Sequence, residues 1–319
     1  IALSSGTAAL HTALAIAGIK EDDEVITTPF TFIATANSIL MQRAKPVFVD
    51  IDEQTYNLNP NLIEKKITKK TKAILAVDLY GQPANYTTLA AIAKKYNLLL
   101  IEDACQAVGA EYEGKKTGAL GDIGCFSFYA TKNITAGEGG IITTNNQEYY
   151  EHAKRFRHHG QTGKTDYDYT ELGYNYRMTD MQAALAIVQL KKIDAITKKR
   201  IENATYLAEK LKECKQVILP RVQKNTVHAF HQFTIRVPAD KRAILIEKLK
   251  QKGISTGIFY PKPLHYYTNF KHLNYKQGDF PTAEAAAKEV LSLPIHPQVS
   301  KEELDVIAET IQSYFLKTT

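Results

Sequence analysis

The first half of the chain alternates short apolar runs with amphipathic stretches, and this alternation limits the possible folds more than any other feature. Four strand-like runs, rich in Val, Ile, Leu and Phe, lie at residues 24–28, 46–50, 72–77 and 98–104. Helical patterns alternate with them at residues 32–43, 59–67 and 85–96. Strands and helices that alternate with short connections build a mostly parallel sheet covered by helices on both faces. The sequence therefore predicts an α/β fold.

Segments on either side extend this α/β unit. Ser4 or Ser5 can cap a helix that carries an apolar face and ends at Gly18. Residues 123–129 and 139–145 are predicted to be two more strands.

A long helical pattern from Thr179 to about Cys214 separates the two halves of the chain. Beyond it we expect strands at residues 227–237 and 254–258, and helices at residues 240–253, 282–290 and 302–315. A length of 319 residues suits two domains, since a domain takes roughly 150 residues. Near Ala195 the alternation of strands and helices has given way to the long helical pattern. We place the domain boundary there, which predicts a large domain over residues 1–195 and a smaller C-terminal α/β domain over residues 196–319.

The composition argues against nucleic-acid binding, a disulfide framework, a cysteine metal site and a membrane span. The net charge of +6 comes from basic residues spread over amphipathic segments such as 65–72 and 191–200, which favours solvated helix faces over nucleic-acid binding. The three cysteines lack the spacing of a disulfide framework or a metal site, which favours a reducing cytoplasm. No apolar run reaches membrane-spanning length, and no signal peptide is visible.

One lysine stands in an unusual setting. Lys132 follows a predicted strand within FSFYATKNITAGEGG, among small and apolar neighbours. A lysine reacts as a nucleophile only after it loses its proton, and a site poor in water favours that loss. The alternative is a loop lysine that simply reaches solvent, so other residues must decide between the two.

An acid and an amide follow the buried run at residues 98–104. Asp103 lies near its carboxyl end, the edge at which open parallel sheets bind ligands. A carboxylate there can hold a pyridinium nitrogen protonated, as pyridoxal phosphate chemistry requires, although it can also cap the next segment. Gln106 is placed to touch the same ligand.

Four further residues fit a phosphorylated ring. Gly6 and Thr7 begin the first helix, where backbone N–H groups bind phosphate, and Ser127 adds a hydroxyl. Phe32 can stack on a planar ring, although such a phenylalanine is more often part of a core. Together with the lysine and the acid, these residues outline a pyridoxal phosphate site.

Two histidines are not assigned to that site. His228 and His231 are three residues apart on the strand predicted at 227–237, and therefore on opposite faces, which is poor geometry for a metal. We interpret both as ordinary strand histidines.

The sequence resembles the DegT/StrS family of sugar aminotransferases, which have the type I fold of pyridoxal-phosphate-dependent transferases. The matching motifs run in family order from residue 4 to residue 265. They are SSGTAAL, TTPFTFIATANSI, VDLYGQPA, IEDACQAVGA, GDIGCFSFYATKNITAGEGG, LGYNYRMTDMQAA and YPKPLH.

The resemblance implies a role for each cofactor residue. Lys132 would form the internal aldimine with pyridoxal 5'-phosphate and later shuttle a proton. Asp103 would pair with the pyridine nitrogen. Gln106 would contact the ring near its 3-hydroxyl, and Phe32 would stack on the ring. The residues that would hold the phosphate are Gly6, Thr7 and Ser127.

The resemblance also implies a partner and a substrate site. Asn175 would reach the phosphate of the neighbouring subunit, so that a homodimer would share its active sites. Tyr260 and His265 would border the substrate. The family also carries a segment before the SSGT motif, and the chain begins at Ile1 without Met, so we expect this sequence to begin inside a longer protein. Asp78 replaces a histidine common in relatives, and the sequence offers no chemical account of that change.

The resemblance implies an aminotransferase that moves an amino group from an L-amino acid, expected to be glutamate, to a nucleotide-linked keto-sugar. One alternative is a sugar dehydratase of the same fold, in which the lysine position is a histidine. Another is a non-catalytic regulator that kept the fold. Lys132 argues against the dehydratase, and the intact set of Asp103, Gln106 and Lys132 argues against the regulator.

Overall fold

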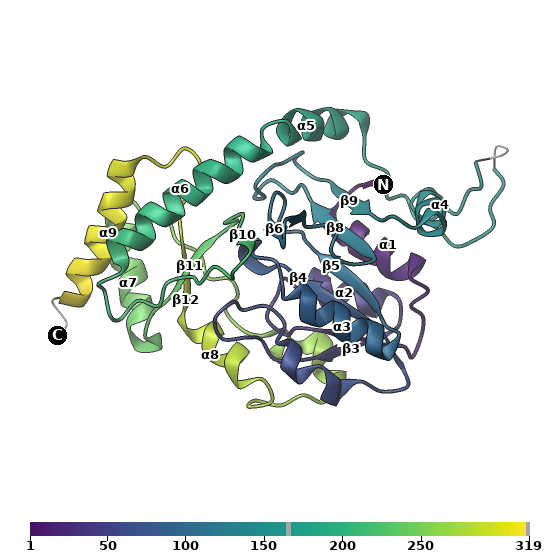
Figure 1. Ribbon diagram of the computed structural model, residues 1–319, viewed down its shortest axis with the longest axis horizontal. Coiled ribbons are helices and arrows are strands. Elements are labelled where there is room, and N and C mark those ends of the chain that lie inside the picture. The colour runs from purple at the N-terminus through teal and green to yellow at the C-terminus, as the bar shows by residue number, and fades with distance from the viewer. Residues whose placement is uncertain (164–166, 317–319) are drawn as a thin grey trace.

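A seven-stranded sheet forms the centre of the computed structural model, which describes residues 1–163 and 167–316 (Figure 1). The strand order is β1-β9-β8-β5-β4-β2-β3. Only β9 runs against its neighbours in this sheet, because every other pairing between adjacent strands is parallel. The mostly parallel sheet predicted from the sequence is confirmed. The strands are β1 (Ala2–Leu3), β2 (Glu24–Thr27), β3 (Lys45–Phe48), β4 (Thr71–Val77), β5 (Leu99–Asp103), β8 (Ile123–Ser127) and β9 (Gly140–Thr143).

Alternation along the central strands divides the core into two layers. In β4, Ala73 and Leu75 point into one buried cluster, whereas Ile74 and Ala76 point into the other. Successive strand residues face opposite sides of a sheet, so a strand buried on both faces is apolar throughout. Helices α1 (Gly6–Ile16) and α2 (Ala34–Met41) cover the first face, and α3 (Tyr86–Tyr96) covers the second.

Capping residues in the sequence fix the start of α1 and the end of α3. The Ser5 hydroxyl accepts a hydrogen bond from the backbone N–H of Ala8 at the start of α1. Asn97 ends α3 in the left-handed region, which asparagine tolerates better than most residues. α4 (Gln147–Phe156) follows β9 and packs against α1.

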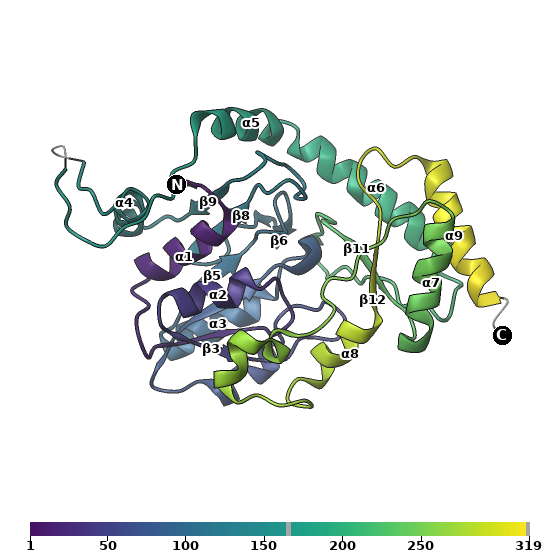
Figure 2. The same cartoon turned by 180° about the vertical axis from the view of Figure 1, so that it is seen from behind.

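A second core lies beyond the sheet. Helices α5 (Asp180–Leu190) and α6 (Ile193–Leu211) lead from the sheet to it, as Figures 1 and 2 show. There α6, α7 (Ala239–Gln251) and α9 (Lys301–Leu316) pack with an antiparallel pair, β11 (Phe233–Arg236) and β12 (Val290–Leu293).

The proposed domain boundary falls inside a helix. Ala195 lies in the first turn of α6, which continues without a break to Leu211. Part of the C-terminal half, including Leu264 and α8 (Pro281–Glu289), packs in one cluster with Phe30 and Phe48 of the first half. The division into residues 1–195 and 196–319 stays a prediction.

Two predicted elements have a different form in the structure. The helix expected at residues 59–67 is a pair of short 3-10 turns, η1 (Pro60–Leu62) and η2 (Glu64–Lys66). Only Ile63 of this stretch is buried, and one apolar anchor cannot fix an amphipathic helix. The strand expected at residues 254–258 is reduced to one isolated bridge, between Gly257 and Ser292.

The strand predicted at residues 227–237 is interrupted. Its ends are β10 (Thr226–Val227) and β11, and Phe230 between them has a positive φ of 42°. The break arises because this backbone bonds to other parts of the fold: Ala229 N–H donates to the Gly81 carbonyl at 2.8 Å, and Gln232 N–H donates to the Tyr80 carbonyl at 3.2 Å. The remaining strands are β6 (Glu111–Tyr112) and β7 (Lys115–Lys116), and the remaining 3-10 turns are η3 (Leu79–Gly81), η4 (Leu264–Tyr266) and η5 (Thr268–Leu273).

Candidate active site

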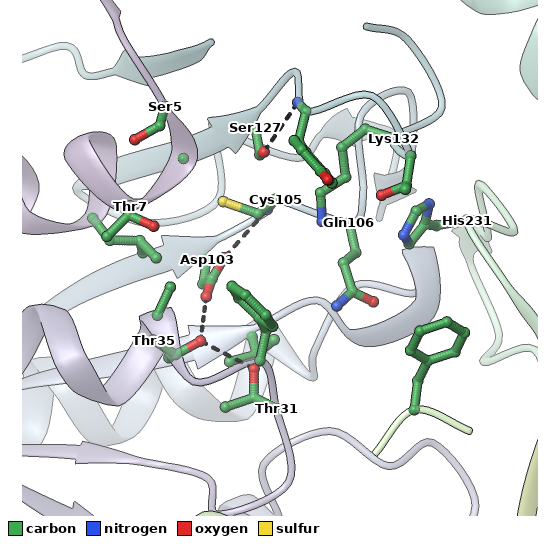
Figure 3. A pocket seen from close by; sticks show the side chains of 18 of the residues that line it. Ser5, Thr7, Thr31, Thr35, Asp103, Cys105, Gln106, Ser127, Lys132 and His231 are labelled. Atoms are coloured by element: carbon green, nitrogen blue, oxygen red, sulfur yellow. Dashed lines mark hydrogen bonds between the residues drawn. The ribbon is translucent and has the colours of Figure 1, made fainter. Parts of the chain in front are cut away.

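A cavity of about 530 Å³ opens at the carboxyl ends of β4, β5 and β8, beside the start of α1 (Figure 3). Its volume lies in the range of small-molecule sites. Most of the site residues predicted from the sequence line it. These are Gly6, Thr7, Phe32, Asp103, Gln106, Ser127, Lys132 and Tyr260.

Asp103 is a buried acid held in a fixed orientation. It ends β5 and is 5% exposed. Its Oδ2 atom accepts a hydrogen bond of 2.6 Å from the Thr35 hydroxyl, and its Oδ1 atom accepts one of 3.3 Å from the backbone N–H of Cys105. Thr31 bonds to Thr35 in turn, hydroxyl to hydroxyl, at 3.0 Å. An oriented carboxylate with oxygen lone pairs to spare is suited to hold a protonated ring nitrogen.

Lys132 reaches into the same cavity from the loop after β8. The backbone N–H of Lys132 donates to the carbonyl of Tyr129 at 2.9 Å, which closes a turn at the base of the side chain. Within residues 1–163 and 167–316, no carboxylate forms an ion pair with its amine. The amine is therefore not tied up in a structural salt bridge.

The start of α1 and the end of β8 form an anion cradle. The first N–H groups of a helix have no partner within the helix and carry partial positive charge. A Cβ atom added at Gly6 would lie 2.7 Å from the Ser127 Cβ atom and 3.0 Å from its Oγ atom. Only glycine therefore allows the helix start to approach the Ser127 hydroxyl so closely. The arrangement fits a phosphate group.

Gln106 and Tyr260 form one wall of the cavity. The Gln106 side chain accepts a hydrogen bond of 2.9 Å from the backbone N–H of Tyr80 and donates one of 3.0 Å to the Tyr260 hydroxyl. Burial raises the pKa of Tyr260 well above its usual value, so its phenol stays neutral. Phe32 lies at the mouth of the cavity, 55% exposed, with its ring centroid 6.3 Å from that of Tyr260.

Two predicted site residues lie elsewhere. His265 is buried outside the cavity, with its Nε2 atom 3.2 Å from the Glu284 carboxylate. Asn175 lies on an exposed segment that bridges to His158, also outside the cavity. Their predicted contacts with substrate and with a neighbouring subunit stay predictions.

The sequence interpretation of His231 as an ordinary strand histidine is wrong. Because residues 228–232 leave the strand, the side chain lines the cavity with Lys132. No local pattern could place it there, since tertiary hydrogen bonds cause the break. Thr35 was also missed; it lies in α2, and its hydroxyl meets that of Thr31 from the irregular segment before the helix.

The structure accounts for Asp78 as a buried support of this wall. Its Oδ1 atom accepts hydrogen bonds of 2.9 Å from the backbone N–H of Ala84 and from the Tyr86 hydroxyl. Its Oδ2 atom is buried without a partner among the described residues. Burial, followed by the charge of Glu102, raises the pKa of Asp78 well above the usual value. Asp78 therefore ties the residue before η3 to the segment after it, while the Tyr80 N–H of η3 holds Gln106, and Asp78 itself does not line the cavity.

Other site types find no support in the described part of the chain. It contains no group of three or more His, Cys, Asp or Glu side chains arranged to hold a metal ion. None of its helices is both long enough and apolar enough to span a membrane.

Comparison with known proteins gives consistent matches. The model of the DegT/DnrJ/EryC1/StrS aminotransferase family matches residues 1–312. A UDP-N-acetyl-3-dehydro-alpha-D-glucosamine 3-aminotransferase from Acidithiobacillus ferrooxidans is 40% identical, over 98% of this chain and 83% of that protein. A "pleiotropic regulatory protein" from Geobacillus stearothermophilus is 46% identical, over 99% of this chain and 84% of that protein.

A solved structure has the same fold. The crystal structure of S. venezuelae DesV in complex with a ketimine intermediate matches with a TM-score of 0.95 and 33% identity. The match covers 99% of this chain and 84% of DesV.

Proposed function

The chain belongs to the DegT/DnrJ/EryC1/StrS aminotransferase family, and from this premise we propose that it transfers an amino group from an L-amino acid to a nucleotide-linked keto-sugar. The type I transferase fold and the pyridoxal phosphate dependence expected from the sequence are confirmed by the family match and by the structural neighbours. Glutamate is the donor that we propose.

One observation carries the proposal. A single cavity brings together an unpaired amine, an oriented buried carboxylate and an anion cradle. Pyridoxal phosphate carries an aldehyde, a basic ring nitrogen and a phosphate, and each of these three groups has a matching partner in the cavity. The residues present therefore fit the cofactor.

Each residue would have a distinct task in the reaction. Bound pyridoxal phosphate supplies an aldehyde that captures amines and a ring that withdraws electrons. Lys132 would hold the cofactor covalently and, once displaced by the donor amine, would carry a proton on its Nζ atom. The Asp103 carboxylate would keep the ring nitrogen protonated. Thr35 and the Cys105 N–H hold that carboxylate in place. Gly6, Thr7 and Ser127 would bind the phosphate.

The wall and the mouth of the cavity would control access. The Gln106–Tyr260 hydrogen bond would border the ring, and Phe32 would cover it from the cavity mouth. Tyr260 and His265 are proposed for the substrate side. The 3-aminotransferase of A. ferrooxidans supports a nucleotide-linked keto-sugar as acceptor, because its name specifies such a substrate.

We propose that the active form is a homodimer with shared sites. Five apolar residues of α5 are each more than half exposed in the single chain, and exposed apolar faces of this kind mark interaction surfaces. They are Met181, Leu185, Ile187, Val188 and Leu190. Asn175 lies on the exposed segment just before this helix, which supports its predicted reach to the partner's phosphate.

A regulatory function is the second candidate, since one relative carries that description. The complete set of Asp103, Gln106 and Lys132 in one cavity favours catalysis. A dehydratase is disfavoured because Lys132 is an amine, which binds an aldehyde covalently, whereas an imidazole does not. We place the enzyme in the cytoplasm, in accord with its three free cysteines.

The test is a panel of nucleotide-linked keto-sugars assayed with glutamate, with release of 2-oxoglutarate as the readout. We expect release that depends on one sugar and on added pyridoxal phosphate. A protein that binds the cofactor, turning yellow, yet releases no 2-oxoglutarate with any sugar would favour the regulatory function. Failure to bind the cofactor at all would contradict the proposal.

A further inference from the structure

His231 occupies a position in the cavity that the proposed reaction has not yet used. It lies in the break between β10 and β11, and its side chain lines the cavity on the same side as Lys132 and Gln106, opposite the Thr35–Asp103 pair (Figure 3). The inference below deepens the proposed function and rests on it.

The backbone around His231 is held by three other segments. Arg200 of α6 donates to the carbonyls of Phe230 at 2.9 Å and of His231 at 3.3 Å. Gly81 of η3 packs so closely that an added Cβ atom would lie 2.8 Å from the backbone nitrogen of His231. Asn133, the neighbour of Lys132, donates through Nδ2 to the Ala229 carbonyl at 3.0 Å. The imidazole is therefore presented from a rigid loop.

Hydrogen bonding selects one tautomer of this imidazole. A carbonyl oxygen can only accept, so the atom of Asn133 that faces Ala229 must be the amide nitrogen. The Asn133 oxygen then faces the Nδ1 atom of His231, at 3.2 Å. An oxygen of this kind can only accept, so Nδ1 carries the proton. The lone pair is left on Nε2, which no other described residue engages.

Burial, reinforced by neighbouring charges, keeps this imidazole neutral. Burial and the neighbouring charges of Lys132 and Arg200 lower the pKa of His231 well below that of a free imidazole. A neutral ring with a lone pair on Nε2 is a hydrogen-bond acceptor. The amine of Lys132 belongs to the same cavity lining and forms no hydrogen bond or ion pair with another described residue. It sits at the end of a flexible four-carbon stem.

We propose that the Nε2 atom of His231 accepts a hydrogen bond from the Lys132 amine once pyridoxamine phosphate occupies the site, and so positions that amine for proton transfer. His231 is a positioning residue in this scheme. Its link to Asn133 ties the imidazole to the same loop that carries the lysine, so the two move together.

The first test reads the tautomer directly. In an NMR spectrum of protein labelled with ¹⁵N-histidine and loaded with pyridoxamine phosphate, His231 should show a protonated Nδ1 and an unprotonated Nε2. His228 is an internal control with the opposite tautomer. Its Nδ1 atom accepts a hydrogen bond from the Phe230 N–H at 2.9 Å, so its Nδ1 should be unprotonated. A His231 protonated on Nε2, or on both nitrogens at neutral pH, would overturn the proposal.

The second test measures how fast an amine-directed reagent labels Lys132. Pyridoxamine phosphate has no aldehyde, so it fills the site and leaves Lys132 free for an amine-directed reagent followed by peptide mass spectrometry. An acceptor beside an amine stabilises its protonated form, which does not react. Lys132 in His231→Phe should therefore be labelled several-fold faster than in the unaltered protein, relative to exposed Lys215 in the same digest.

Matched variants separate this role from others. His231→Gln keeps an acceptor and should label nearly as the unaltered protein does. His228→Phe removes a buried imidazole from the same loop outside the cavity and should leave Lys132 labelling unchanged. In steady state, His231→Phe should lower kcat roughly 10- to 100-fold, as misplacement of a reacting group does.

The outcomes also separate this inference from the proposed function. Unchanged labelling in His231→Phe, with a higher KM for the sugar alone, would mean that the imidazole binds substrate, and would overturn the inference while leaving the aminotransferase intact. Failure of the protein to bind pyridoxamine phosphate would instead contradict the proposed function.

Discussion

The hydroxyl of Thr35 donates a hydrogen bond of 2.6 Å to the Oδ2 atom of Asp103. Thr35 lies on α2 and Asp103 ends β5, so the bond joins a helix that covers the sheet to the acid at the edge of the sheet. Both side chains are buried. A charge-assisted bond in such a setting orients the carboxylate.

Thr35→Val removes this donor while keeping the volume of the side chain. Hydrogen bonds to charged groups contribute about 1.5–3 kcal/mol, so we expect the rate of amino transfer to fall roughly 10- to 100-fold. Stopped-flow measurement of the glutamate half-reaction checks this. Thr12→Val is the matched control, because the buried hydroxyl of Thr12 has no partner among the described residues. Equal rates in both variants would show that Thr35 does not support Asp103.

Gly6→Ala tests the anion cradle. Its Cβ atom would lie 2.7 Å from the Ser127 Cβ atom, so the start of α1 must move away from β8. We expect weaker binding of pyridoxal phosphate, measured by titration of its absorbance, and a lower Tm. Adding Ser127→Gly removes the clashing atom and should restore Tm, although not the lost hydroxyl contact. A Gly6→Ala variant with unaltered affinity would mean that the phosphate binds elsewhere.

Asp78 should make the free energy of unfolding depend on pH, in a direction that its raised pKa determines. Its pKa is raised in the folded state, so the folded protein binds the proton more strongly than the unfolded chain does. The contribution of Asp78 to stability is therefore full below the unfolded pKa and is lost as the pH rises from there toward the folded pKa. The slope is up to about 1.4 kcal/mol per pH unit.

Asp78→Asn removes this titration. We expect denaturant unfolding of the unaltered protein to show a loss of stability relative to the variant over the pH range that begins at about 4, the ordinary pKa of an aspartic acid. The relevant quantity is the difference between the two proteins at each pH, which cancels the titration of other groups. A difference that stays constant across this range would show that Asp78 is ionised in the folded state.

The apolar face of α5 predicts how the chains assemble. Leu185→Glu places a charge in the proposed interface, so we expect sedimentation to show dissociation to monomers and loss of bound cofactor. Ile244→Glu on α7 is the control, since Ile244 is a similarly exposed apolar residue, 52% against 56% for Leu185. Asn175→Ala should leave the dimer largely intact but release cofactor more readily. A Leu185→Glu monomer that keeps both cofactor and turnover would exclude a shared site.

Much of the fold could be predicted because the pattern is local. Residues 73–77 of β4 are apolar on both faces, and Ser5 caps α1, so both elements are visible in the sequence. The cofactor set could be predicted because Asp103 and Ser127 end two strands and Lys132 follows the second of them, at the edge where a parallel sheet places its ligands. Eight predicted residues line one cavity.

The missed features depend on contacts distant in sequence. His231 enters the cavity because Arg200, Gly81 and Asn133 hold its loop away from the strand. Nothing within a few residues of His231 encodes those partners. The same holds for Asp78, whose burial against Glu102 depends on the packing of β4 beside β5.

Covalent capture of the cofactor by Lys132 is the central claim, and one measurement tests it most directly. Purified protein is loaded with pyridoxal phosphate, reduced with borohydride, digested and mapped by mass spectrometry, with Lys132→Ala in parallel. We expect the reduced cofactor on Lys132 alone, and we expect Lys132→Ala to lose both the label and at least ~100-fold of its turnover, as loss of an acid–base group does. Cofactor on another lysine, or full turnover in Lys132→Ala, would contradict the account.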